Sequence, residues 1–144
     1  MICGKRNQQP LDERSLNACR LAWEMLTDQK EGLDVINARK AGSKTHYDPK
    51  RDLVVLGVDV LPGDALDGNS HLSILACLAH ELIHRKRYHD KSAREYIGLN
   101  IYIDEAETSL LALLYPISKF DKKDLVSDGQ LRLQMWQNEF VKSK

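Results

Sequence analysis

The chain has 144 residues, the length of one ordinary domain, so we expect residues 1–144 to form a single domain. Its 21 Lys and Arg residues balance its 21 Asp and Glu residues, which argues against a strongly basic nucleic-acid-binding protein and against an acidic disordered tail. Hydrophobic residues make up 42% and charged residues 29%, as in soluble globular proteins.

The sequence has no apolar stretch of the roughly 20 residues that a membrane helix needs. The most apolar stretch, residues 72–83, is interrupted by His80 and Glu81. The first ten residues, MICGKRNQQP, lack the hydrophobic stretch of a signal peptide. The cysteines are few, widely spaced and odd in number: Cys3, Cys19 and Cys77. We therefore expect reduced thiols in a cytoplasmic protein with no membrane partner.

The first half of the chain predicts one helix and a small sheet. Pro10 and Asp12 precede apolar residues that recur at three- to five-residue steps, which predicts a helix over 11–32 and a second short helical segment near residues 35–36. Residues 53–58, LVVLGV, are apolar and β-branched, and a turn over 47–51 precedes them. This pattern predicts two short strands within 40–59.

The second half predicts three helices. Residues 71–89, with Ser70 as N-cap, are apolar on nearly all sides, which is typical of a helix in the centre of a fold. A helix over 93–115 ends at Pro116, and an amphipathic helix follows over 121–141, with Gly129 as a candidate break. Its expected buried face is Leu125, Leu131, Met135, Trp136 and Phe140. The whole predicts an α+β fold, mostly helical, with a two- to three-stranded sheet and a core over 40–117.

The central helix contains His80-Glu81-Leu82-Ile83-His84, an HExxH motif. Residues four apart lie on one helical face, so both imidazoles can reach one Zn²⁺ at about 2.0–2.1 Å. Glu81 is rotated by about 100° from His80 and flanks the metal, where a carboxylate can act as general base. The alternative is a helix with surface histidines. The apolar flanks favour burial, which costs several kcal/mol unless a partner such as a metal satisfies these groups.

A catalytic zinc requires a third protein ligand and one open position. Glu105 is preferred, because the small residues Thr108, Ser109 and Ala112 share its helical face and allow close approach to the motif helix. Its alternative role is that of a solvated surface carboxylate.

Two further carboxylates and one histidine are alternative third ligands. Asp90 follows His84 by six residues, but Arg87 stands where a turn-forming Gly normally precedes such a ligand. Glu107 lies about 200° round the helix from Glu105, so the two cannot ligate one metal together. His89 would have to fold back directly after the motif.

The segment Glu105-Ala106-Glu107-Thr108-Ser109-Leu110-Leu111-Ala112-Leu113-Leu114-Tyr115-Pro116 resembles the EA(N)xxAxxLLxP signature of ImmA/IrrE-like metallopeptidases, which carry an upstream HExxH helix preceded by a small sheet. The resemblance covers residues 47–116. It indicates a divergent member, because the family usually has Gly, Asn and an aromatic residue where Ile83, Glu107 and Ser109 stand.

The resemblance implies a zincin-like fold and a gluzincin-type site of His80, His84 and Glu105, with Glu81 as base. It further implies a zinc metalloendopeptidase that makes limited cuts in a protein or peptide substrate, such as a regulatory protein or repressor. The apolar segment 53–60 is a candidate strand for binding an extended substrate. A second hypothesis is a non-proteolytic zinc-binding regulatory or interaction module.

Basic residues cluster over 85–94, directly after the motif: Arg85, Lys86, Arg87, Lys91 and Arg94. They favour either a contact with an acidic substrate or nucleic acid, as in a DNA-associated protease, or a solvated helix end whose cations complement the helix dipole. The second interpretation is preferred. A zincin also needs a donor for its oxyanion. The sequence does not choose among His46, Tyr47, His71, Tyr88, His89, Tyr96 and Tyr102. Cys77 is expected to be a small buried thiol.

Overall fold

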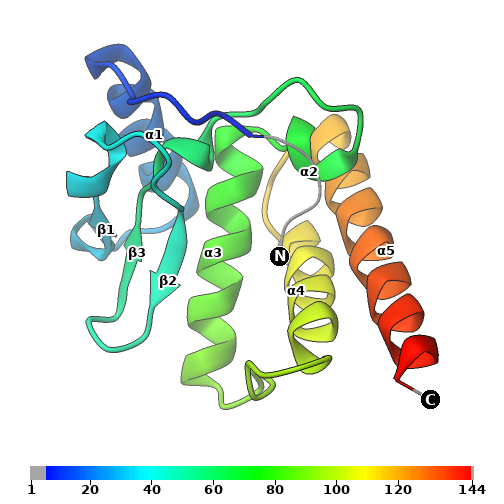
Figure 1. The fold of residues 1–144 in the computed structure, drawn as a ribbon. Coiled ribbons are helices and arrows are strands. Elements are labelled where there is room, and N and C mark those ends of the chain that lie inside the picture. The colour runs from blue at the N-terminus through cyan, green and yellow to red at the C-terminus, as the bar shows by residue number, and fades with distance from the viewer. Residues whose placement is uncertain (1–5, 144) are drawn as a thin grey trace.

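The computed structural model describes residues 6–143 and has an α+β, mostly helical fold (Figure 1), as predicted. Its helices are α1 (Glu13–Leu26), α2 (Gly68–His71), α3 (Ile74–His89), α4 (Asn100–Leu111) and α5 (Lys119–Lys142). Its strands are β1 (Leu33–Asp34), β2 (His46–Asp48) and β3 (Leu53–Val55). Cys3 lies outside the described residues. None of the described helices combines the length and the apolar character that a membrane span requires.

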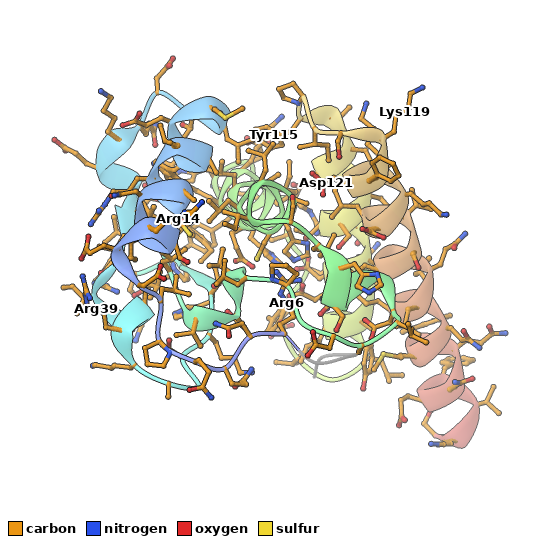
Figure 2. The ribbon with its side chains drawn as sticks, turned by 90° about the horizontal axis from the view of Figure 1, so that it is seen from above. Arg6, Arg14, Arg39, Tyr115, Lys119 and Asp121 are labelled. Carbon is orange, nitrogen blue, oxygen red and sulfur yellow. The ribbon has the colours of Figure 1, made fainter. Side chains whose placement is uncertain are left out.

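Helix α3 stands in the middle of the molecule. Figure 1 shows α1 and the sheet on one side of it and α4 and α5 on the other, and Figure 2 shows the same order in a view along α3. The predicted N-cap, Ser70, is wrong, because it lies within the separate short helix α2. Ser73 caps α3 instead, and its hydroxyl accepts a hydrogen bond from the Ala76 amide at 3.1 Å. The predicted central position of this helix is confirmed.

Two apolar clusters hold α3 in place. One lies between α1, the sheet and α3, and it includes Leu16, Trp23, Val54 and Leu78. The other lies on the opposite side of α3 and includes Ala76, Ala79, Ile83, Ile117 and Leu125. Because apolar neighbours cover both sides of the helix, its polar residues are confined to the remaining strip.

The sheet has the order β1-β3-β2, so β3 is the central strand and β2 lies at an edge. Strands β2 and β3 form the predicted hairpin, with Tyr47 opposite Val54. Strand β1 pairs parallel to β3. The sequence did not predict it, because a strand of two residues is too short to show an alternation of apolar and polar residues. The predicted strand over 53–58 ends at Val55, since a 3₁₀ turn forms over Val58–Val60.

Two predicted helices are shorter than expected. The first ends at Leu26, after which Thr27 is extended. The indole of Trp23 donates to the carbonyl of Gln29 at 2.7 Å and packs over Gly32, and this contact folds the chain back. The helix expected over 93–115 begins only at Asn100 and passes into a 3₁₀ turn over Ala112–Leu114. Residues 90–99 instead form a loop.

Helix α5 runs continuously through Gly129, which therefore does not break it. A side chain at Gly129 would begin 3.2 Å from Leu110, so the glycine permits close contact with α4. The predicted buried face is wrong, because only Leu125 of that set is buried. The residues of α5 that are buried are mainly polar: Asp121, Leu125, Asp128, Gly129 and Arg132. Asp128 and Arg132 turn inward because they bind polar side chains of α4.

Gly57 is required where the chain leaves β3. A Cβ atom at this position would lie 2.3 Å from the carbonyl carbon of Lys44 and 2.6 Å from the amide nitrogen of Thr45. We expect Gly57→Ala to lower the free energy of unfolding by about 3 kcal/mol, because these backbone atoms cannot move aside as a flexible side chain would.

Urea denaturation followed by circular dichroism measures this loss. Gly98→Ala is the comparison, because no atom lies within 4 Å of its Cβ position and only its left-handed φ of 53° is unfavourable, at a cost of about 1 kcal/mol. A Gly57→Ala protein at least as stable as Gly98→Ala would show that the chain relaxes at Gly57.

Candidate metal centre

The two motif histidines meet Glu105 in a buried group. Nε2 of His80 lies 3.1 Å from Nε2 of His84 and 2.9 Å from Oε2 of Glu105. Nε2 of His84 lies 3.1 Å from Oε1 of Glu105. The histidines are one turn apart on α3 and the glutamate comes from α4, so the group depends on the packing of these two helices. This group could hold a metal ion.

A chain of hydrogen bonds decides which nitrogen of His80 carries its proton. The Ser109 hydroxyl donates to Oδ2 of Asp128 at 2.5 Å, and Asp128 is paired with Arg132 at 2.9 Å. The hydroxyl hydrogen is thereby used, so Ser109 must accept from Nδ1 of His80 at 3.0 Å. The neutral His80 ring then presents a lone pair at Nε2, directed at a carboxylate oxygen. Two electron-rich atoms at this separation need a cation between them.

The charges of His84 and Glu105 are consistent with such a cation site. Burial opposes a charge on His84, but the carboxylate of Glu105 outweighs it and raises the pKa of His84 to about 9. Burial likewise opposes the charge on Glu105, but the positive charge of His84 outweighs it and holds the pKa of Glu105 well below its usual value. A proton on His84 therefore supplies the positive charge when no metal does, and a metal would displace it.

Glu81 lies beside this group in a cleft. Its side chain is buried on α3, and burial raises the pKa of its carboxyl above the ordinary value. The cleft has a volume of about 1520 Å³, and its walls include α3, the α3–α4 loop and the segment that leads into β2. Arg6, labelled in Figure 2, fixes the first described residues along it by donating to the carbonyls of Leu72 and Val60, each at 2.9 Å.

Glu105 has two further partners. The Tyr96 hydroxyl donates to Oε1 at 2.8 Å, and Nη1 of Arg132 lies 3.3 Å from Oε2. Partial burial and the Glu105 carboxylate raise the pKa of the Tyr96 phenol above its usual value. Ser109, Asp128 and Arg132 form the outer layer of the group, and sequence reasoning did not identify Asp128 or Arg132. Asp128 and Arg132 are four residues apart and so form an oppositely charged pair on one face of α5. This spacing is the feature of the sequence that could have pointed to them.

The alternative third ligands lie outside the group. Asp90 is exposed at the end of α3. The carboxylate of Glu107 binds the guanidinium groups of Arg94 and Arg87. His89 contacts Oδ1 of Asp52 at 2.7 Å. The structure thus brings Glu105 to the two motif histidines, and it brings none of these three residues there.

The arginines of the 85–94 cluster are engaged within the protein. Arg85 donates to both carboxylate oxygens of Asp52, at 3.1 and 3.0 Å. Arg87 is buried and lies 2.9 Å from Oδ1 of Asp104, while Arg94 binds Glu107. Lys86 and Lys91 are exposed. Most of the positive charge of this cluster is therefore balanced by neighbouring carboxylates.

Cys77 is half-buried and lines the cleft, and burial raises the pKa of its thiol to about 12. Among the described residues, the group with metal-binding geometry comprises His80, His84 and Glu105 and no cysteine.

The chain matches no protein-family model, and neither the curated proteins nor the solved structures contain a match to it.

We expect Ser109→Ala and Asp128→Asn each to weaken metal affinity by about 10- to 100-fold, because each breaks the chain of hydrogen bonds that orients His80. Isothermal titration of the metal-free protein with Zn²⁺ measures the change. Asp124→Asn, one turn earlier on α5 and outside the group, is the matched control. An affinity of Ser109→Ala equal to that of the wild type would contradict the orienting role of Ser109.

Proposed function

We propose that the protein is a zinc-dependent metalloendopeptidase. The observation that carries this proposal is the convergence of His80, His84 and Glu105 beside a buried Glu81 at the wall of a cleft. We further propose that the chain is a divergent relative of the ImmA/IrrE-like metallopeptidases that acts in the cytoplasm on a regulatory protein. That part rests on the HExxH motif and on the segment from Glu105 to Pro116.

Zinc suits this donor set better than other divalent metals. Two imidazoles and a carboxylate are the ligands of many catalytic zinc sites, and tetrahedral bonds of about 2.05 Å place ligand atoms about 3.3–3.4 Å apart. The three separations here are 2.9, 3.1 and 3.1 Å. An outward shift of a few tenths of an ångström would make room for the ion. Three protein ligands leave the open position that catalysis needs.

Glu81 is the proposed general base. Zinc, when bound, polarises the peptide carbonyl and makes water more acidic. Glu81 accepts a proton from the attacking water and delivers it to the leaving amine. Burial raises the pKa of the Glu81 carboxyl above its ordinary value, which favours its holding the proton between the two steps.

The proposed substrate-binding edge is β2. The segment 53–60, expected to bind an extended substrate, includes β3, whose two edges are occupied by β1 and β2. Strand β2 has a partner on one side only among the described strands, and His46 and Tyr47 line the cleft. An extended peptide can therefore pair with the backbone of β2 and cross the metal centre.

Two alternatives receive less support. A DNA-associated protease would need free cations, but Arg85, Arg87 and Arg94 are all paired with carboxylates. A non-proteolytic zinc module would be favoured by a closed site with four protein ligands, whereas the described group offers three beside a cleft.

We expect Glu81→Gln to retain zinc and the native fold but to lower peptide hydrolysis by about 1,000-fold, because the amide cannot accept the proton. Cleavage of an internally quenched peptide library, zinc content and thermal unfolding are measured together. Glu139→Gln, which removes an exposed carboxylate near the end of α5, is the matched control. Full cleavage by Glu81→Gln would refute its role as base, and no cleavage by the wild type would refute the peptidase assignment.

A further inference from the structure

We propose that Tyr96 is the oxyanion-stabilising residue of this peptidase: its hydroxyl donates a hydrogen bond to the scissile carbonyl oxygen as that oxygen becomes negatively charged. This inference rests on the proposed peptidase function. It selects one residue from seven candidates that the sequence left equivalent.

The position of the Tyr96 hydroxyl is the first support. It lies 2.8 Å from Oε1 of Glu105, and this same oxygen lies 3.1 Å from Nε2 of His84. The hydroxyl is thus one hydrogen bond away from the atoms that converge on the metal position. The Tyr96 side chain lines the cleft and is 55% exposed, so a peptide in the cleft can reach it.

Hydrogen bonds hold the first part of the 90–99 loop, which carries Tyr96. The amide of Arg94 donates to Oδ1 of Asp104 at 2.9 Å, and the buried guanidinium of Arg87 donates to the carbonyls of Ser92 and Asp104 at 3.1 and 2.9 Å. Tyr96 follows Arg94 by two residues and Ser92 by four. Because Asp104 precedes Glu105 on α4, the same contacts place Tyr96 and the ligand glutamate relative to each other. The donor is therefore held in position before substrate binds.

Among the hydrogen bonds of the described residues, none joins the other six candidates to His80, His84 or Glu105. The Tyr47 hydroxyl and Nε2 of His89 both contact Asp52 at 2.7 Å. Nδ1 of His46 contacts the carbonyl of Lys44, and His71 is exposed outside the cleft. Tyr88 packs against the ring of Tyr47. Tyr102 lines the cleft, but no hydrogen bond within residues 6–143 joins it to the three metal-binding side chains.

Arg132 also approaches Glu105, but two carboxylates bind it. Its guanidinium lies 3.3 Å from Glu105 and 2.9 Å from Asp128, and the side chain is buried. The role of Arg132 is therefore to hold the side chains of Glu105 and Asp128 in place. Tyr96 approaches Glu105 from the exposed loop instead.

The chemical step balances with Tyr96 as a donor only. The oxygen of water bonds to the carbonyl carbon, the C=O π pair moves onto the carbonyl oxygen, and Glu81 takes the proton of the water. The Tyr96 hydroxyl moves its one hydrogen bond from Oε1 of Glu105 to the resulting oxyanion and keeps its own proton. The C=O bond then re-forms as the C–N bond breaks, and Glu81 passes the proton to the amine.

The test compares Tyr96→Phe with wild type on the internally quenched peptide that wild type cleaves fastest. We expect kcat to fall by about 100-fold while KM and zinc content stay at wild-type values, because the donor acts on the transition state. A phosphinic analogue of the same peptide, which mimics the tetrahedral state, should lose affinity by a similar factor. Tyr115→Phe, outside the cleft, is the matched control and should leave kcat, KM and analogue affinity unchanged.

Each other outcome overturns the inference in a recognisable way. An unchanged kcat for Tyr96→Phe, with active wild type, refutes Tyr96 as the donor and leaves the peptidase function intact. A loss of zinc from Tyr96→Phe shows that the tyrosine only holds Glu105. A rise in KM with unchanged kcat shows ordinary substrate binding. A wild type that cleaves no peptide refutes the peptidase function, and this inference falls with it.

Discussion

The site depends on one hydrogen bond, from Nδ1 of His80 to the hydroxyl of Ser109. Because Ser109 gives its own hydrogen to Asp128, it can only accept from His80, and the lone pair of His80 must then face Glu105. A metal ion or a proton between these two atoms is required to offset the repulsion between the lone pair of His80 and the carboxylate of Glu105. The tautomer that a metal ligand needs is thus selected by α4 and α5 and not by the motif itself.

This constraint explains why a helix so far along the chain matters to the centre. Asp128 and Arg132 are buried charges on α5, and their desolvation is acceptable because they bind each other, Ser109 and Glu105. Gly129 lies between them and lets α5 approach α4 closely. The apolar clusters on the two sides of α3 hold the motif helix rigidly against this polar layer. The proposed peptidase chemistry then needs the cleft, Glu81 and the Tyr96 hydroxyl beside Glu105.

Local sequence patterns predicted the motif helix, its central position, the hairpin and the approach of Glu105 to the histidines. The last of these followed from small residues beside Glu105, and one of them, Ser109, contacts His80 directly. The sequence misled on α5, because Trp136 and Phe140 form an apolar stripe. In the folded chain these two rings stack on each other and neither is fully buried, while the polar residues turn inward.

The loop over 90–99 was also missed, for a similar physical reason. Residues 93–99 have acceptable helical composition, but the carboxylate of Asp104 and the guanidinium of Arg87 bind the backbone of this segment and hold it away from a helix. The first contact joins residues ten positions apart and the second depends on a buried charge, and a local pattern contains neither. Tyr96 could be singled out only after this loop was placed.

X-ray absorption at the zinc edge, on protein reconstituted with one equivalent of Zn²⁺, tests the metal centre most directly. The account predicts two imidazole nitrogens at about 2.0–2.1 Å, oxygen at about 2.0–2.2 Å and no sulfur. A sulfur ligand at about 2.3 Å, which would implicate a cysteine, would contradict it, as would protein that retains no zinc.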